Sequence, residues 1–174
     1  MFCEFCTYIV VLLLLKLLYN QAMNDNEKYM SLALKAAQKA LRKDEVPVGA
    51  IIVRRGKVIA SAYNLRESKK NPLAHAEVLV IEKAARKLKG WRLTQCKLYV
   101  TLEPCPMCAG AIINARIDNV YFGAYDSKAG AFGSVYDLAQ GKLNHTPNVT
   151  GGILNDECAS LLTDYFKDKR NKRK

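Results

Sequence analysis

Helical periodicity opens the main body of the chain at Met23. Within MNDNEKYMSLALKAAQKALRK, apolar residues recur every three to four positions, as on the buried face of an amphipathic helix. Asn24 or Asn26 stands before this face and can accept a hydrogen bond from the first turn. Pro47 stops any continuation, because proline lacks the amide hydrogen that a helix interior needs. The pattern therefore predicts a helix that ends before residue 47.

A strand-like pattern replaces the helical period after this proline. In VGAIIVRRGKVIASAYN, two runs rich in β-branched residues flank RRGK at positions 54–57, where the glycine suits a tight turn. We therefore predict a β-hairpin. A loop over residues 64–74 follows. LAHAEVLVIEKAARKL (residues 73–88) then predicts a helix that runs to about Lys89 and ends at Gly90.

The second half of the chain alternates strands with helices. CKLYVTL and NVYFGAYD each predict a strand, and PCPMCAGAIINARI predicts a helix that starts near Pro106. Residues 127–150 read as loop, with a short helix near residues 135–139. Asn155 or Asp156 can cap a last helix, DECASLLTDYFKDKR. This alternation predicts a layered α/β domain.

Composition narrows the class of protein. The chain has 174 residues, 50% of them apolar, which is enough for the core of one domain and not clearly enough for two. A net charge of +11 and a pI of about 9.4 favour an anionic partner, either nucleic acid or a membrane surface, with an inert basic surface as the alternative. The six cysteines of this lysine-rich chain fit reduced thiols better than a disulfide framework, so we expect a cytoplasmic protein.

The first 22 residues differ from the rest. Their apolar run, residues 9–18, contains a lysine and is shorter than the roughly 20 residues of a membrane-spanning helix. A glutamate precedes the run where a signal peptide would carry lysine or arginine. We therefore predict that residues 1–22 are a dispensable extension and that the working protein starts at Met23. Residues 23–174 would form a single domain with a basic C-terminal tail and no membrane partner.

Metal-binding chemistry concentrates in His75-Ala76-Glu77 and in the segment that carries Cys105 and Cys108. Two cysteines three apart at a helix start can hold one ion from a single turn, where the helix terminus and the metal both favour thiolate. His75 can supply a third ligand. Two cysteines and one histidine leave a tetrahedral position open, as in catalytic zinc sites. Glu77 can then take a proton from a water bound there, so the pattern predicts a catalytic zinc centre rather than a structural one.

The order HAE, then PCxxC, is similar to the signature of the zinc-dependent nucleoside deaminases. Over roughly residues 27–170, the chain resembles the bacterial tRNA-specific adenosine deaminases in EVPVGAII, AYN, LAHAE, LYVTLEPCPMCAGAI, FGAYDSKAGAFGS and GILNDECASLLTDYF. Residues 1–22 have no counterpart in that family. The resemblance implies a three-layer α/β/α cytidine-deaminase-like fold with a mixed five-stranded sheet. It also implies a homodimer whose partner subunit helps to form each site.

The same resemblance implies a reaction. His75, Cys105 and Cys108 would bind one Zn²⁺ per subunit, and Glu77 would shuttle protons while an activated water attacks C6 of adenine. Glu77 would protonate N1, ammonia would leave, and inosine would remain. The target would be the first anticodon position, the wobble position, of a tRNA, with the ACG-anticodon arginine tRNA as the expected substrate.

Further residues match positions that contact the RNA in this family. The resemblance implies that Asn64 contacts the target nucleoside and that the loop with Asp126 contacts the nucleotides beside it. Tyr125 departs from the family, which often has an arginine there. Lys128 belongs to the same loop as Asp126. Tyr165 and Phe166 could stack on bases, and phosphate contacts would come from the basic residues of the tail, Lys167, Lys169, Arg170, Lys172, Arg173 and Lys174. Each also has an ordinary alternative: a turn residue for Asn64 and Asp126, core positions for the aromatics, a solvated tail for the basic residues.

Two other functions stay open on the sequence alone. A deaminase of free purines or pyrimidines would carry a similar zinc motif, but it would not need a strongly basic surface. A zinc-stabilised RNA-binding protein without catalysis would not need Glu77. The basic C-terminus and the FGAYDSKAGAFGS loop favour an enzyme that acts on RNA.

Overall fold

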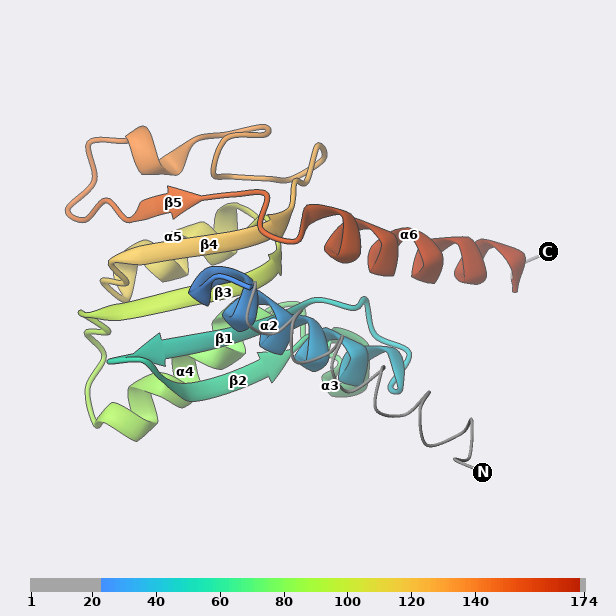
Figure 1. Cartoon of the computed structure of the whole chain (residues 1–174), viewed down its shortest axis with the longest axis horizontal. Helices are drawn as coiled ribbons and strands as arrows, with labels where there is room; N and C mark the ends of the chain where they lie inside the picture. The colour runs from blue at the N-terminus through green and yellow to red at the C-terminus, as the bar shows by residue number, and fades with distance from the viewer. Residues whose placement is uncertain (1–22, 173–174) are drawn as a thin grey trace, which may run out of the picture.

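One mixed sheet of five strands lies between two layers of helices in the computed structural model, which describes residues 23–172 (Figure 1). The strand order is β2-β1-β3-β4-β5, with β1 antiparallel to β2 and β3, and with β3, β4 and β5 mutually parallel. The strands are β1 (Gly49–Arg54), β2 (Lys57–Tyr63), β3 (Cys96–Leu102), β4 (Asn119–Ala124) and β5 (Asn148–Thr150). The predicted three-layer α/β/α fold with a mixed five-stranded sheet is confirmed.

Helices cover both faces of the sheet. α2 (Asp25–Leu41) and α6 (Asn155–Asn171) pack on one face, and α4 (Ala76–Leu88) and α5 (Pro106–Asn114) lie side by side on the other. A short helix, α3 (Arg66–Lys69), joins β2 to α4. α6 packs on β3 and β4, where Cys158 lies against Gly123, and the rest of the helix extends beyond the sheet (Figure 1). Within residues 23–172, no helix is long and apolar enough to cross a membrane.

The central strand β1 is buried on both faces. Ile51 and Val53 pack with Met30 of α2, whereas Ala50 and Ile52 belong to the larger cluster under α4 and α5. At Gly49, any Cβ atom would overlap the backbone of α2, so only glycine allows this close approach of helix and strand. Burial on both faces explains why this strand reads as an unbroken apolar run.

The structure confirms the local features that the sequence predicted. Asn24 caps α2. The hairpin turns through Arg55 and Gly56, whose φ angles of 49° and 71° are both positive, as in a type I′ turn. α4 ends at Leu88 with Lys89 in the left-handed conformation, one position before the predicted glycine. The prediction about residues 1–22 concerns a segment outside the described residues.

Three predictions in the second half were wrong. Residues 148–150, expected to be loop, form the strand β5. Neither Asn155 nor Asp156 caps α6; the N-cap is Leu154, in the left-handed conformation and without a side-chain hydrogen bond. The amides of Gly152 and Ile153 bond to carbonyls at the end of β4, so the chain turns into the helix only at Leu154. The short helix expected near residues 135–139 is instead a single 3₁₀ turn, Leu138–Gln140.

Candidate active site

The starts of α4 and α5 meet at the edge of the sheet where β3 ends. His75 is the N-cap residue of α4, Cys105 is the N-cap residue of α5, and Cys108 lies in the first turn of α5. His75 Nδ1 lies 3.5 Å from Cys108 Sγ and 3.9 Å from Cys105 Sγ. Tetrahedral ligands about 2.0–2.3 Å from a zinc ion stand roughly 3.6 Å from one another. The three side chains therefore fit around one ion, as the sequence predicted.

The charge balance of the two thiols also suits a cation. A hydrogen bond from Cys108 lowers the pKa of the Cys105 thiol to about 4. Burial opposes this shift, and the contact with His75 adds a smaller lowering of the pKa. The contact with Cys105, together with burial, raises the pKa of Cys108. One thiolate thus opposes the formation of a second one beside it. A bound divalent cation would relieve that repulsion and hold both in the ionised form.

Glu77 lies in the first turn of α4, two residues after the histidine, and only 4% of its surface is exposed. Burial raises the pKa of its carboxyl group, because the site removes the water that would solvate the charge. Glu77, His75 and Cys105 line one cavity of about 260 Å³. Drug-sized ligands usually occupy roughly 300–1,000 Å³, so this cavity suits a single nucleobase.

Two predicted substrate residues, Asn64 and Asp126, also line this cavity. Asn64 follows β2, is buried, and accepts a hydrogen bond from the amide of Ala76 at 2.8 Å, which caps α4. Since its oxygen is engaged, Nδ2 is the atom with which a ligand could bond. Asp126 accepts hydrogen bonds from the amides of Lys128 and Ala129 at 2.9 and 3.2 Å. Both side chains therefore accept hydrogen bonds from backbone amides and also line the cavity.

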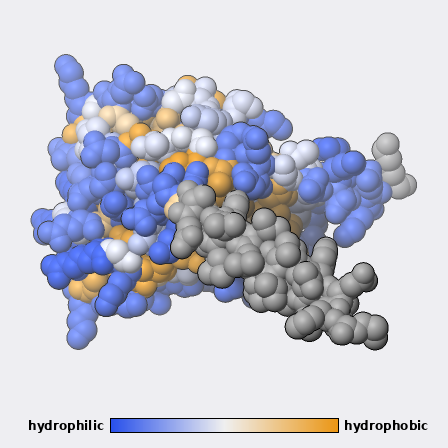
Figure 2. Space-filling model, viewed as in Figure 1, coloured by the Kyte–Doolittle hydropathy of each residue, from blue (hydrophilic) through white to orange (hydrophobic). Residues whose placement is uncertain are grey.

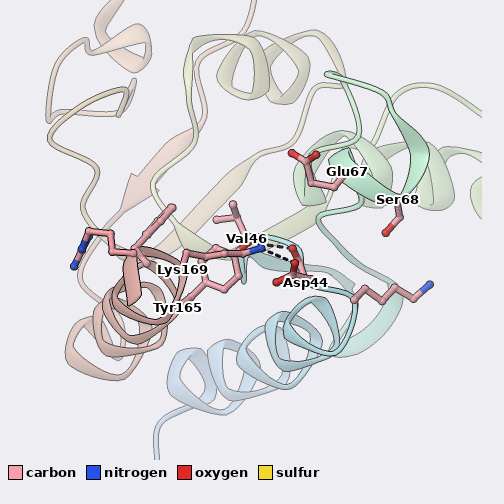
Figure 3. A pocket seen from close by; sticks show the side chains of 9 residues that line it. Asp44, Val46, Glu67, Ser68, Tyr165 and Lys169 are labelled. Carbon is pink, nitrogen blue, oxygen red and sulfur yellow. Dashed lines mark hydrogen bonds and ion pairs between the residues drawn. The ribbon is translucent and has the colours of Figure 1, made fainter. Parts of the chain in front are cut away.

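The remaining predicted residues lie outside the small cavity, except for Phe166. Tyr165, Phe166 and Arg170 line a neighbouring groove of about 660 Å³ (Figure 3). Phe166 belongs to both hollows. Phe166 is 45% exposed, so its ring is open to a partner. Lys128 is exposed and lines neither hollow.

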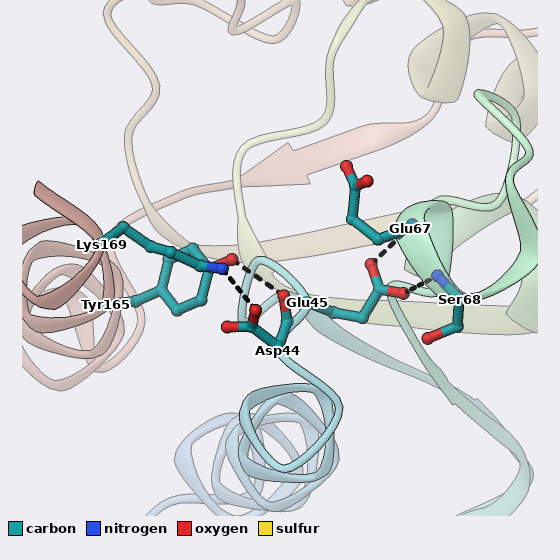
Figure 4. Close-up of polar contacts among 6 residues, drawn as sticks. All are labelled: Asp44, Glu45, Glu67, Ser68, Tyr165 and Lys169. Carbon is teal, nitrogen blue, oxygen red and sulfur yellow. Dashed lines mark hydrogen bonds and ion pairs between the residues drawn. The ribbon is translucent and has the colours of Figure 1, made fainter. Parts of the chain in front are cut away.

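Tyr165 anchors α6 across the groove. Its hydroxyl donates a hydrogen bond of 3.0 Å to the carbonyl of Asp44, and Lys169 forms an ion pair with the Asp44 carboxylate (Figure 4). These contacts tie the part of α6 beyond the sheet to the loop before β1. Figure 4 also shows Glu45 on that loop, pointing toward the start of α3.

Sequence reasoning missed two buried carboxylates near the cavity. Glu45 accepts hydrogen bonds from the amides of Glu67 and Ser68 at 3.1 and 2.7 Å. Glu103 lies two residues before Cys105, is 2% exposed, and lines the cavity. For Glu103 the available signal was an acidic residue directly after an apolar strand, in LYVTLEPC; Glu45 follows charged residues and gave no such signal.

Comparisons with known proteins agree with this architecture. Residues 24–170 match the family of MafB19-like deaminases. The tRNA-specific adenosine deaminase of Bacillus subtilis (strain 168) is 48% identical over 153 residues, which cover 87% of this chain and 95% of that protein. A solved chain from a study of A-to-I editing by tRNA:A34 deaminases at the wobble position of transfer RNA is 45% identical, with a TM-score of 0.74 over 78% of this chain and 99% of that one.

A more distant likeness connects the fold to deaminases of free bases. A solved guanine deaminase from Nitrosomonas europaea has a TM-score of 0.68 at 27% identity and covers 80% of this chain and 83% of that one. The fold predicted as cytidine-deaminase-like is thus confirmed by its solved neighbours. The identity over nearly the full length of the Bacillus protein is much higher, and this chain belongs to the family of tRNA-specific adenosine deaminases.

Proposed function

We propose that this protein converts adenosine to inosine at the first anticodon position of a tRNA by zinc-dependent hydrolysis. The observation that carries the proposal is the convergence of His75, Cys105 and Cys108 on one point beside the buried Glu77. The family supplies the class of substrate, and the ACG-anticodon arginine tRNA is the expected target.

His75, Cys105 and Cys108 would hold one Zn²⁺ per subunit, which leaves one tetrahedral position open to the cavity. Bound zinc supplies Lewis acidity, which makes a water molecule a nucleophile near neutral pH. The thiol groups must stay reduced for this role, which places the working enzyme in a reducing compartment such as the cytoplasm.

Glu77 would move the protons of the reaction. It would accept a proton from the attacking water and deliver it to N1 of adenine. It would then take the proton of the hydroxyl group added at C6 and deliver it to the amino group on the same carbon, which leaves as ammonia. Water and adenosine thus become inosine and ammonia. Asn64 would orient the base through Nδ2, since its oxygen already binds the amide of Ala76.

The groove beside the cavity would receive the nucleotides that flank the target. Phe166 offers an exposed ring on which a base can stack, and Arg170 offers charge for a phosphate. Asp126 and Lys128 would contact the nucleotides on the other side. The part of α6 beyond the sheet is covered mainly by hydrophilic side chains (Figure 2), as a contact with phosphates requires. An adenosine in an anticodon loop is unpaired, so its extrusion costs less than extrusion from a duplex.

Tyr165 has a different role in this proposal from the stacking expected of it. Its hydroxyl is bonded to Asp44, so it would fix α6 and thereby place Phe166. The proposal also includes a homodimer, as the resemblance implies; light scattering of the purified protein measures its mass directly.

The experiment uses the full chain purified with zinc and a transcript of the ACG-anticodon arginine tRNA. Nuclease digestion and mass spectrometry should find inosine at the first anticodon position. Glu77→Gln should keep the zinc and the affinity for tRNA and lose inosine formation. Glu82→Gln is the matched control, because Glu82 lies on the same helix but is exposed and ion-paired with Arg86; it should keep full activity.

Other outcomes would point elsewhere. Zinc-loaded protein that leaves the tRNA unchanged but deaminates free guanine, adenosine or cytidine would be a free-base enzyme. Inosine formation that survives Glu77→Gln unchanged would remove Glu77 from the mechanism.

A further inference from the structure

The buried carboxylate of Glu103 accepts four hydrogen bonds from one loop beside the cavity. Glu103 follows β3, and its Oε1 accepts from the amides of Phe132 and Ser134 at 3.0 and 3.1 Å. Its Oε2 accepts from the amide of Asp126 at 3.1 Å and from the hydroxyl of Ser134. Each of these donors belongs to residues 126–134, a segment more than twenty positions away along the chain.

Backbone contacts fit the loop around the same group. The amide of Glu103 bonds to the carbonyl of Ala124 at 2.9 Å, and the amide of Ala131 bonds to the carbonyl of Pro104 at 2.9 Å. At Gly130, any Cβ atom would overlap the carboxylate of Glu103, so glycine is needed for the loop to pass this closely. The backbone of the loop therefore fits closely around the Glu103 carboxylate.

A carboxylate is the side chain that can satisfy these donors. When ionised it only accepts hydrogen bonds, and both of its oxygens accept. Glutamine has almost the same shape but carries an amide nitrogen at one position. That nitrogen would face either the amides of Phe132 and Ser134 or the donors of Asp126 and Ser134, so donor would oppose donor.

The position of Glu103 links the two sides of the site. Two residues further on stands Cys105, on the metal side. The loop that Glu103 holds carries Asp126 and Ala129, which line the cavity on the substrate side. We infer that Glu103 is a positioning residue: it fixes the 126–134 loop against the metal-binding end of β3 and thereby sets the affinity for RNA. This inference rests on the proposed function.

The test compares zinc-loaded full-length Glu103→Gln, Glu103→Asp and Ser134→Ala with the exposed control Glu82→Gln. Three readouts are needed: zinc content, hydrogen exchange of peptides across residues 126–134, and KM and kcat for inosine formation in tRNA. Glu103→Gln should keep one zinc per chain, speed exchange in this loop alone, and raise KM about tenfold while kcat changes less than about threefold.

The other two variants should change KM less than Glu103→Gln does. Glu103→Asp keeps two acceptor oxygens but is one methylene shorter, so it should restore part of the lost affinity. Ser134→Ala removes one of the four donors and should raise KM about two- to threefold. Because Ser134 lies on the loop itself, this variant decides the question if Glu103→Gln fails to fold.

Two results would overturn the inference. One is unchanged exchange and unchanged KM in the folded variant, whether Glu103→Gln or Ser134→Ala. The other is an equal loss of zinc, kcat and overall stability with no gain from Glu103→Asp, which would make Glu103 a residue of the fold alone. Failure of the proposed function looks different: the unmodified protein forms no inosine, while the exchange measurement still reports on the loop.

Discussion

α2 and the helices around the cavity begin in different ways. α2 satisfies its own first turn: Asn24 Oδ1 accepts from the amide of Glu27, and Glu27 Oε2 accepts from the amide of Asn24, both at 3.0 Å. This capping box involves residues only three apart. It needs nothing from the rest of the molecule.

Side chains from distant positions cap the helices beside the cavity. The amide of Ala76 at the start of α4 bonds to Asn64, and the first amides of α3 bond to Glu45. His75 and Cys105 occupy the N-cap positions of α4 and α5 but form no cap hydrogen bond with their side chains. Those side chains meet at the metal site instead.

The difference follows from what one side chain can do. An N-cap residue that binds a metal cannot also accept a hydrogen bond from its own helix, so the free amides need other partners. In this protein Asn64 is such a partner, and it lines the cavity as well. The geometry of the site therefore depends on tertiary contacts, whereas the capping box of α2 does not.

The largest expected loss of stability comes from Glu45→Gln. Glu45 is almost fully buried and accepts two backbone amides, so its replacement should lower the free energy of unfolding at neutral pH by roughly 2 kcal/mol. Denaturant titration measures this change. A loss no larger than that of an exposed Glu82→Gln control would show that α3 does not need its distant cap.

The pH dependence of stability provides a second test of Glu45. Burial alone would raise the pKa of Glu45, but the hydrogen bonds from Ser68 and Glu67 outweigh it and hold the pKa below the ordinary 4.5. Its stabilising contribution is therefore complete above pH 4.5 and is lost as the pH falls through the lower pKa of the folded state. As the pH falls below 4.5, the stability of Glu45→Gln should fall less than that of the unmodified protein.

A smaller loss of stability, with a clear loss of activity, is expected from Asn64→Ala. Removing the cap of α4 should lower the free energy of unfolding by about 1.5 kcal/mol. Asn64→Asp keeps the acceptor oxygen but lacks the amide donor. It should retain more of the stability and still lose inosine formation, which thermal unfolding and tRNA assays would separate. Full activity in both variants would exclude Asn64 from the substrate contact.

The smallest effect is expected from Asn24→Ala. Loss of this cap should lower the free energy of unfolding by about 1 kcal/mol. The value of kcat/KM should stay unchanged, because α2 packs on the face of the sheet opposite to α4 and α5. If Asn24→Ala reduced activity as strongly as Asn64→Ala, the contrast between the two kinds of helix start would not hold.

Features that depend on near neighbours could be predicted from the sequence. The cap at Asn24, the turn through Gly56 and the pair of cysteines within one helical turn each involve residues no more than four positions apart. The metal ligands could be predicted as a set for two reasons. His75 and the two cysteines lie at the starts of predicted helices, and the family resemblance assigns both motifs to one metal site.

The remaining features depend on how distant parts of the chain pack together. β5 has three residues and shows no alternation that a pattern could detect. The cap of α6 moved to Leu154 because preceding amides pair with the end of β4. Glu45, Glu103 and Tyr165 act through partners 22 to 121 positions away. Local periodicity reports which face of an element is buried, but it does not report which distant donor a buried carboxylate or hydroxyl will meet; that depends on how the chain packs.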